Sequence, residues 1–250
     1  NKKKHHLEFI SDVKELWLAS SRRGSDSCGI YILFTKKNFI QKDIIFRVSS
    51  SPENILNSDK FENLLNDFNE NGFIIEFIVG HTRMNTDGSS YLQKNNQPLA
   101  YDDSLLVFNG IVTNAADFNH TLNSNDGYIL LDNFHKNKSI EKFNNFLTNS
   151  VSGMINLIMF KRSLGELYFY TNNGSLYTND VKNPIIICSE PTFTSNFSLK
   201  RIPLCKTILI KNNIKLPKKL QIIDLKCNKS PVIVADVDYS KKFTKAEKVF

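Results

Sequence analysis

The sequence predicts a layered α+β domain, because two kinds of apolar pattern occupy different parts of the chain. Over roughly the first 150 residues, apolar side chains at helical spacing alternate with apolar runs typical of buried strands. From Val151 onward the runs become shorter and β-rich, and residues of turn type separate them. Helices and strands in this order pack as layers around a shared core.

Length and composition agree with a globular protein of this class. The 250 residues suffice for one large domain or two small ones, and contents of 41% apolar and 23% charged residues are ordinary for a soluble chain. The net charge of +7 comes from lysines scattered along the sequence, without a long basic helix or a base-stacking aromatic motif. We therefore expect the charge to aid solvation, and we expect no nucleic-acid partner.

Cysteine spacing and hydropathy limit the cellular setting. The four cysteines, Cys28, Cys188, Cys205 and Cys227, are far apart and include no Cys-x-x-Cys pair, which argues against a zinc site or a disulfide framework and fits a reducing compartment. No apolar run reaches the ~18 residues of a membrane span, and no signal-peptide core follows the polar start at Asn1. We expect a cytoplasmic protein with no metal, no cofactor and no membrane contact.

Helices are expected mainly in the first part of the chain. Phe9, Val13 and Trp17 recur at helical spacing and predict an amphipathic helix, and Asn71-Gly72 is a helix-ending signal. In chain order, the expected elements are a helix at 8–20, a turn at 22–27, strands at 28–34 and 44–48 joined by a turn at 36–38, a helix in one or two pieces from Ser51-Pro52 through Phe68, a strand at 73–79, a polar connector at 89–103, a strand at 105–108, a short helix at 114–118, and helices starting at Asp126 and Ser139.

The rest of the chain is expected to form a strand meander. Turn signals such as Asn172-Asn173-Gly174 and Asn183-Pro184 separate the β-rich runs at 154–160, 166–170, 185–188, 207–210 and 221–225. Residues 236–250 are charged and contain no stop signal, as in a linker toward a further domain. We therefore expect one domain over residues 1–235 and a linker over residues 236–250.

A polar loop with an arginine follows the apolar run Phe73 to Val79. The sequence Gly80-His81-Thr82-Arg83 ends the run and opens into a segment rich in Asn, Thr, Asp, Gly and Ser. Strand ends that open into polar loops are frequent places for chemistry. The planar fork of donors on Arg83 suits bidentate capture of a carboxylate. Taken alone, the same pattern also fits an ordinary surface arginine beside a turn.

Four motifs occur in a fixed order around this loop. They are Arg23-Gly-Ser-Asp-Ser-Cys-Gly-Ile30, Gly80-His-Thr-Arg83, Gln97-Pro98 and Asn109-Gly-Ile-Val-Thr-Asn114. In this order they resemble the signatures of the glutaminase domain of class II glutamine amidotransferases, over roughly the first 130 residues. Each motif is weak by itself, whereas the ordered set is specific. The resemblance implies the four-layer αββα sandwich of the N-terminal-nucleophile (Ntn) hydrolases, with two mainly antiparallel sheets between helices.

The resemblance also implies a glutamine site. Arg83 would hold the α-carboxylate, Asp126 would accept hydrogen bonds from the α-ammonium, and the Asn109 amide with the Gly110 N–H would form the oxyanion hole. Glycine at 110 would let the backbone approach the reacting carbonyl. A helix N-cap is the alternative role of Asp126. A hairpin turn is the alternative for Asn109-Gly110, which we reject because no obvious partner strand follows. Phe108 replaces the family's usual histidine before Asn-Gly.

Supporting roles follow from the same resemblance. Thr86 and Asp87 would shape the glutamine pocket. Arg23 and Asp26 would buttress the site. His81 is expected to be a structural hydrogen-bonding residue at the strand end, because the base in this family is the free α-amino group of the nucleophile.

The family's nucleophile is missing from the motif set. Its N-terminal Cys-Gly-Ile signature is absent, and Asn1 has neither a thiol nor a hydroxyl group. Cys28 precedes Gly-Ile, but it stands where the family has a small, non-nucleophilic residue, so we expect a buried structural cysteine. Either the nucleophile strand precedes Asn1, or a separate chain supplies it, or the protein is an inactive relative. The first explanation is favoured because Arg83, Asn109-Gly110 and Asp126 are all present.

The sequence therefore leaves two candidate functions. The first is a glutamine-hydrolysing, ammonia-releasing domain of a glutamine-dependent amidotransferase or synthase, with L-glutamine as substrate and an ammonia-accepting synthase or transferase domain as partner. A homo-oligomer is compatible with this function. The second is a catalytically inactive amidotransferase-like module that binds glutamine or scaffolds a partner. A different Ntn acyl hydrolase fits less well, because Arg83 with Asp126 suits a free amino acid.

Overall fold

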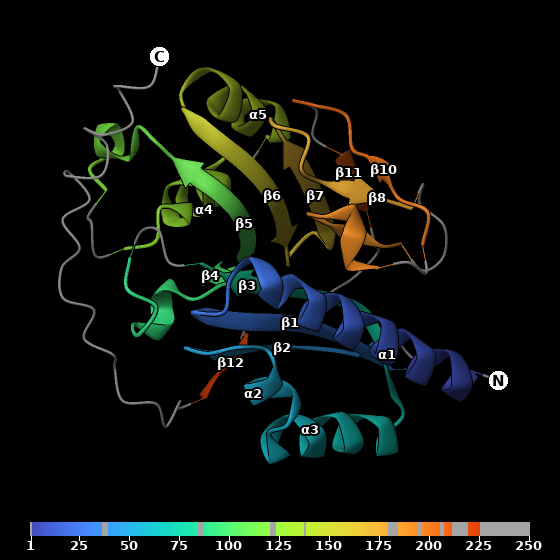
Figure 1. The fold of residues 1–250 in the computed structure, drawn as a ribbon. Helices are drawn as coiled ribbons and strands as arrows, with labels where there is room; N and C mark the ends of the chain where they lie inside the picture. Colours follow the sequence, from blue (N-terminus) through green and yellow to red (C-terminus); the bar gives the residue numbers. More distant parts are fainter. Residues whose placement is uncertain are drawn as a thin grey trace.

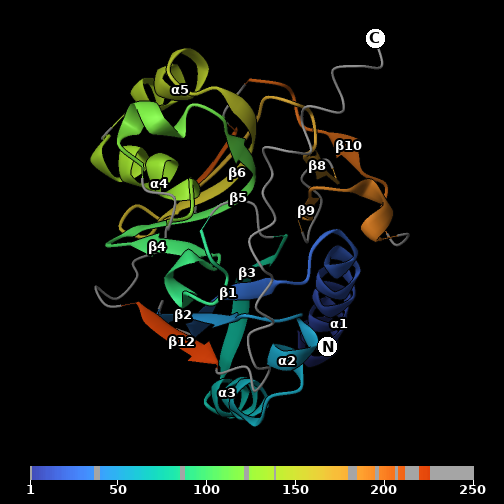
Figure 2. The ribbon, with the colours of Figure 1, turned by 60° about the vertical axis from the view of Figure 1, so that its left-hand side comes forward.

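The protein is a sandwich of two sheets between helices (Figures 1 and 2). The computed structural model describes residues 2–36, 40–84, 88–120, 124–137, 139–179, 185–194, 197–205, 208–211 and 220–225. Helices α1 to α3 lie on one side of the paired sheets, and helices α4 and α5 lie on the other. The layers therefore follow the order helix, sheet, sheet, helix.

The first sheet has the strand order β12-β2-β1-β3. β1 is antiparallel to β2 and to β3, and β12 is parallel to β2. Ile30 and Ile32 of β1 pack toward the helices, while Tyr31 and Leu33 face the second sheet, as the two-residue period of a strand requires. The strands are β1 (Ser27–Lys36), β2 (Ile40–Val48), β3 (Phe73–Arg83) and β12 (Gln221–Leu225).

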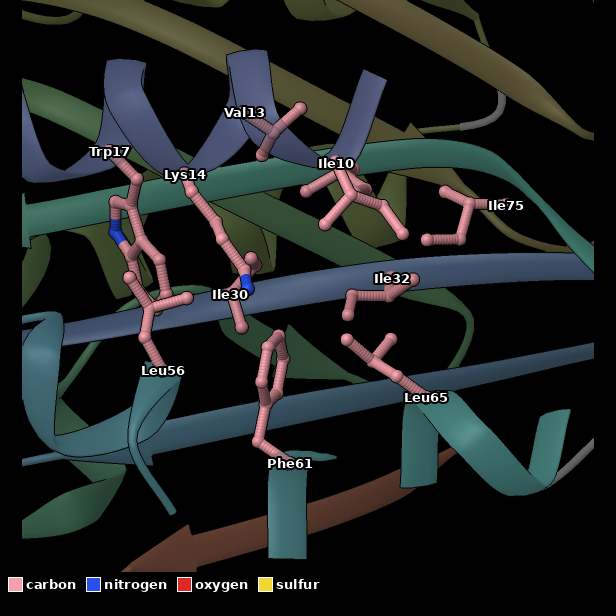
Figure 3. A pocket seen from close by; sticks show the side chains of 11 residues that line it. Ile10, Val13, Lys14, Trp17, Ile30, Ile32, Leu56, Phe61, Leu65 and Ile75 are labelled. Atoms are coloured by element: carbon pink, nitrogen blue, oxygen red, sulfur yellow. The ribbon is translucent and has the colours of Figure 1, made fainter. Parts of the chain in front are cut away.

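Three helices and a 3-10 turn cover the outer face of this sheet. They are α1 (Lys2–Ser20), η1 (Ser21–Arg23), α2 (Glu53–Leu56) and α3 (Asp59–Glu70). Ser58 caps α3, because its hydroxyl accepts a hydrogen bond from the Phe61 N–H. Between α1, α3 and the sheet lies a void of about 10 Å³, lined by apolar side chains and by Lys14 (Figure 3). It has room for about one water molecule and none for a ligand.

The second sheet is antiparallel, with the strand order β11-β7-β6-β5-β4. Its strands are β4 (Leu99–Tyr101), β5 (Ser104–Val112), β6 (Gly153–Lys161), β7 (Glu166–Thr171) and β11 (Ile208–Lys211). Helices α4 (Gly127–Lys136) and α5 (Ile140–Asn149) pack on its outer face. Leu106 and Phe108 of β5 enter that core, so the alternate residues of β5 face the first sheet.

Short elements complete the chain. A three-stranded sheet of order β10-β8-β9 contains β8 (Tyr177–Thr178), β9 (Ile187–Cys188) and β10 (Lys200–Arg201). Three further 3-10 turns are η3 (Gln93–Asn95), η4 (Ala115–Phe118) and η5 (Pro191–Phe193). Among the residues described, none of the helices combines the length and the apolar character that crossing a membrane requires.

The two sheets meet through apolar side chains and a buried ion pair. Tyr31 and Leu33 of the first sheet pack with Leu105 of the second. Arg162 donates from Nε and Nη2 to the two oxygens of Asp43, at 2.6 and 2.9 Å, and the Tyr31 hydroxyl donates to Asp43 Oδ2 at 3.1 Å. This cluster ties β2 to the turn after β6.

The expected α+β sandwich is confirmed, and most expected elements are present within one to a few residues. Four differences matter. The first helix begins at Lys2 instead of residue 8, and α2 begins at Glu53 instead of Ser51-Pro52. The connector at 89–103 contains η3 and β4, and β5 continues past Phe108 to Val112. The expected linker at 236–250 and most of the turn at 36–38 lie outside the described residues.

Candidate functional site

Arg83 lies at the end of β3 and faces the second sheet. In the β1–β3 register, Val79 pairs with Tyr31, His81 with Gly29, and Arg83 with Ser27. Tyr31 faces the second sheet, so the side chains of His81 and Arg83, at alternate positions, share that face. Arg83 is only 5% exposed. The guanidinium is therefore held inside the sandwich and not on its surface.

Asn109 faces Arg83's sheet from β5. It lies four residues after Leu105, which packs between the sheets, so Asn109 shares that inner face. The Asn109 side chain is half-buried. The alternative of a hairpin turn at Asn109-Gly110 is wrong, because both residues lie within β5 and pair with Asn156 and Ile155 of β6.

At Gly110, β5 pairs with β6 along one edge. Along the opposite edge, side chains form hydrogen bonds to the β5 backbone. On one side of Gly110, the Phe108 N–H and C=O both bond to the Gln97 side-chain amide; on the other, the Val112 N–H donates to Asp126. Because alternate residues of a strand direct their backbone groups to one side, the Gly110 N–H points to this same edge. Glycine is required here because a Cβ would lie 1.8 Å from the Met154 carbonyl oxygen of β6. The reason expected from the sequence was a different one, the approach of the backbone to the reacting carbonyl of the substrate.

Asp126 reaches this edge from the start of α4. Its Oδ2 accepts the Val112 N–H at 2.8 Å, and the side chain is 5% exposed. Asp126 occupies the N-cap position, yet its side chain makes no capping hydrogen bond to α4. The carboxylate is therefore directed at β5 and not at the helix end.

The loop after β3 brings Arg83 toward Asp126. Arg83 Nη2 donates to the Gly88 carbonyl oxygen at 2.7 Å. A Cβ on Gly88 would lie 2.7 Å from the Ser124 carbonyl carbon and 2.8 Å from the Asn125 nitrogen. Arg83 thus holds a glycine that packs directly against the residues preceding Asp126. Asn125 is held in turn by Asn95, through bonds of 3.2 and 2.9 Å.

His81 connects the two sheets beside these groups. Its Nε2 lies 3.1 Å from the Phe108 carbonyl oxygen, and its own carbonyl accepts the Trp17 indole N–H at 3.2 Å. Removal from water, and then the charge of Arg83, lower the pKa of His81 to about 4. The ring is therefore neutral at pH 7.

The residues expected to buttress the site lie at the β3 end. The Asp26 N–H donates to the Arg83 carbonyl oxygen at 3.0 Å, which fixes the backbone of the arginine. Arg23 forms an ion pair of 3.2 Å with Glu190, with both side chains partly exposed. Arg23 therefore ties η1 to the segment after β9. Thr86 and Asp87 lie outside the described residues.

Cys28 is a core residue. Its side chain is fully buried among the apolar residues that face α1 to α3, and burial raises the pKa of its thiol well above the usual range. The expected structural role is confirmed. Among the described cysteines, Cys188 is half-buried and donates to the Glu190 carbonyl oxygen, while Cys205 is exposed.

Gln97 has a position that the sequence did not reveal. In the sequence it belongs to the Gln-Pro motif, which by itself indicates no role for the side chain. Its backbone lies on β1, because a Cβ at Gly29 would lie 2.2 Å from the Gln97 carbonyl oxygen. Its side chain pairs with both backbone groups of Phe108 in β5. Two sequence features could have indicated this position of Gln97: the Gln97-Pro98 motif, and Gly29, against which Gln97 packs.

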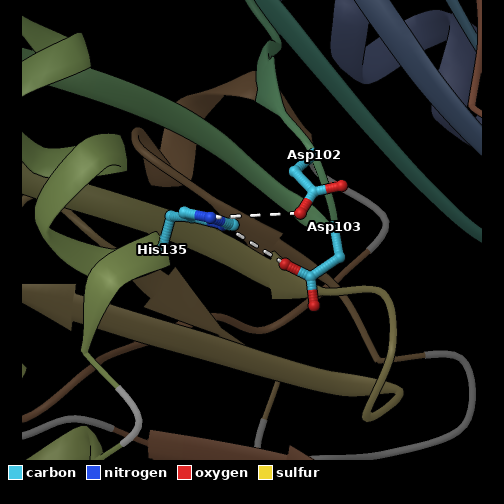
Figure 4. A group of neighbouring side chains, drawn as sticks. All are labelled: Asp102, Asp103 and His135. Atoms are coloured by element: carbon cyan, nitrogen blue, oxygen red, sulfur yellow. Dashed lines mark ion pairs between the residues drawn. The ribbon is translucent and has the colours of Figure 1, made fainter.

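One group of acidic and histidine side chains in the described residues could in principle hold a metal ion. Ligand atoms of Asp102, Asp103 and His135 lie within 4.8 Å of one another (Figure 4), beside a cavity of about 450 Å³. Asp103 already pairs with Lys161 Nζ at 2.9 Å and accepts a hydrogen bond from Ser163. The Lys161 ammonium therefore compensates the negative charge of Asp103, as a metal ion would do.

Comparison with known proteins supports the fold alone. No protein-family model and no curated protein matches the sequence. Glutamine phosphoribosylpyrophosphate (PRPP) amidotransferase from B. subtilis, solved with ADP and GMP, matches with a TM-score of 0.54 and 12% identity over 80% of this chain and 43% of that chain. A structure described as the allosteric regulatory enzyme of purine biosynthesis gives 0.55 and 13%, over 80% and 44%.

The chain thus spans less than half the length of either matched protein. At such low identity the matches establish architecture and not chemistry. The matches rest on the three-dimensional arrangement of the helices and strands. The chain therefore shares the α+β sandwich fold of glutamine PRPP amidotransferase, as the motifs led us to expect.

Proposed function

We propose that this chain is the glutamine-hydrolysing, ammonia-releasing domain of a glutamine-dependent amidotransferase or synthase. What supports the proposal is that Arg83 and Asp126 are both buried, while hydrogen bonds link β3 to β5 through His81, Arg83 to Gly88, and Asp126 to β5. Arg83 and Asn109 share the space between the sheets, and Asp126 lies at the edge of β5. The carboxylate, ammonium and side-chain amide of glutamine would be complementary to Arg83, Asp126 and Asn109-Gly110, respectively.

Recognition of the amino-acid end rests on opposite charges. The glutamine α-carboxylate would receive paired hydrogen bonds from Arg83. The α-ammonium would donate to Asp126. A carboxylate offers about four lone-pair sites, so the bond from the Val112 N–H fixes its orientation without exhausting its capacity.

The oxyanion hole acts on the other end of the substrate. When a thiolate attacks the side-chain amide, a C–S bond forms and the carbonyl oxygen becomes negative. The Asn109 amide and the Gly110 N–H would stabilise that charge. Collapse of the intermediate breaks the C–N bond, a proton goes to the leaving nitrogen, and ammonia departs. Water then cleaves the thioester to give glutamate and restore the thiol.

Cys28 is not placed to be the nucleophile. Cys28 lies in the core on the opposite side of the first sheet. A cysteine on a segment before Asn1, or on a separate chain, would supply the thiolate. The ammonia would pass to a synthase or transferase domain. The second candidate, an inactive module that binds glutamine, is supported by the same buried Arg83 and Asp126 and requires no thiol.

Asn109→Ala in the full-length protein is expected to lower kcat for ammonia release from glutamine by about 10²-fold, the loss typical of one oxyanion donor. Glutamine affinity should change little, because the donor acts mainly in the transition state. Coupled-enzyme detection of ammonia and calorimetric glutamine titration measure the two quantities. Asn66→Ala, an exposed asparagine on α3, is the matched control. If the wild-type protein binds glutamine but releases no ammonia, the inactive module is favoured. If the wild-type protein does neither, both candidates are refuted.

A further inference from the structure

The backbone of Phe108 is held by two side chains, His81 from the first sheet and Gln97 from the segment before β4. His81 extends from β3 and lies with Nε2 at 3.1 Å from the Phe108 carbonyl oxygen. Gln97 sits on Gly29 of β1 and pairs with Phe108 through Nε2 to the carbonyl, at 2.8 Å, and through Oε1 to the N–H, at 2.5 Å. The backbone N–H and C=O of Phe108 thus form three hydrogen bonds, one with His81 of the first sheet and two with Gln97, which packs on that sheet at Gly29.

The hydrogen-bond chemistry fixes the state of the imidazole. A carbonyl oxygen only accepts hydrogen bonds, so Nε2 of His81 must carry the proton. The Nδ1 atom of the neutral ring is then an acceptor. It is buried and has no hydrogen-bond partner among the described residues. Only the Nε2–H tautomer lets this side chain join the sheets.

This grip lies between the two ends of the proposed site. Arg83 is two residues beyond His81 on the same face of β3, about 7 Å along a strand. Asn109 directly follows Phe108 in β5. The group for the carboxylate thus belongs to the first sheet, and the group for the side-chain amide belongs to the second. The distance between these groups depends on the spacing of the sheets at Phe108.

We propose that His81, together with Gln97, is a positioning and specificity-determining residue that sets the length of amino acid the site accepts. The inference rests on the proposed glutamine site. With the Phe108 backbone held, the separation of Arg83 and Asn109 is fixed, and asparagine, one methylene shorter, would not engage both ends of a site that fits glutamine. Without the His81 bond the sheets can shift at this point, and the preference for the longer side chain is lost.

The test compares L-glutamine with L-asparagine by calorimetry on the full-length protein. The wild type should prefer glutamine by about 10- to 200-fold, the range for one methylene. His81→Asn, whose amide is too short to reach Phe108, should reduce that ratio by about tenfold. His81→Gln places an N–H near the position of the imidazole Nε2 and should restore the ratio. Thermal unfolding of each variant reports separately on stability.

Each outcome decides a different point. If the wild type binds neither amino acid, the proposed function fails and this inference fails with it. If the wild type prefers glutamine and His81→Asn keeps the same ratio, only the inference fails, and a purely structural His81 would give that result. Should His81→Asn not fold, nitrogen NMR of the wild-type ring still decides, since a proton on Nδ1 would overturn the inference and a proton on Nε2 supports it.

Discussion

Arg83→Ala is expected to weaken L-glutamine binding by roughly 30-fold to several thousand-fold. Truncating one partner of a buried, hydrogen-bonded charge pair costs about 2–5 kcal/mol, and every 1.4 kcal/mol is tenfold in affinity. Arg83 is 5% exposed, so water screens its charge little. Calorimetric titration of the full-length protein is the appropriate measurement, because KM equals the dissociation constant only when chemistry is slow.

Two further variants separate the fork from the charge. Arg83→Lys keeps the positive charge without the planar pair of donors, and should restore only part of the affinity. Arg22→Ala removes an exposed arginine nearby and should leave binding unchanged. Because Arg83 also holds the Gly88 carbonyl, a small fall in the unfolding temperature of Arg83→Ala is expected. Equal glutamine affinities for Arg83→Ala and Arg22→Ala would exclude Arg83 from the site.

Sequence patterns were sufficient where a local signal and the tertiary environment agree. The strand beginning at Cys28 and the helix beginning after Ser139 have the expected period, and Ser139 caps the helix through the Lys142 N–H. Cys28 was assigned to the core because of the residues around it in the motif, and it is fully buried. The motif order also led to the correct sandwich, since those motifs fall at strand ends that meet.

Local patterns alone left two possible roles for a signal where distant segments decide between them. Asn-Gly is a hairpin signal, but pairing with β6 keeps Asn109-Gly110 inside a strand, and the Met154 carbonyl makes glycine necessary. Asp before a helix is an N-cap signal, but the Asp126 carboxylate accepts a hydrogen bond from the Val112 N–H and makes no capping bond. In both cases the partner lies 14 or more residues away along the chain, beyond the range of local propensity.

Two-residue strands and side-chain pairing were also beyond prediction. β8 and β10 each contain two residues, too few to show any period. Gln97 replaces a strand by bonding both backbone groups of Phe108 through its amide. That arrangement depends on the close approach of Gln97 to Gly29, which no spacing in the sequence expresses.

The spacing of the sheets also depends on the ion pair at the far side of the interlayer core. Arg162 and Asp43 are 3% and 0% exposed, and their guanidinium–carboxylate contact is bidentate. Tyr31 adds a third hydrogen bond to the same carboxylate, and burial with the Asp43 charge raises the pKa of the Tyr31 hydroxyl well above its usual range. The tyrosine therefore stays protonated and acts as a donor to Asp43.

Arg162→Ala is expected to lower the free energy of unfolding by about 3–5 kcal/mol, because it leaves the Asp43 carboxylate buried without a counter-charge. Replacing both residues together, as Asp43→Leu with Arg162→Met, should recover much of this loss, since apolar residues of similar volume need no compensation. Lys136→Ala, which removes the exposed pair with Asp132, is the control and should leave stability nearly unchanged. Urea unfolding measures all three variants. If the double variant is no more stable than Arg162→Ala, the loss comes from packing, and an uncompensated charge is not its cause.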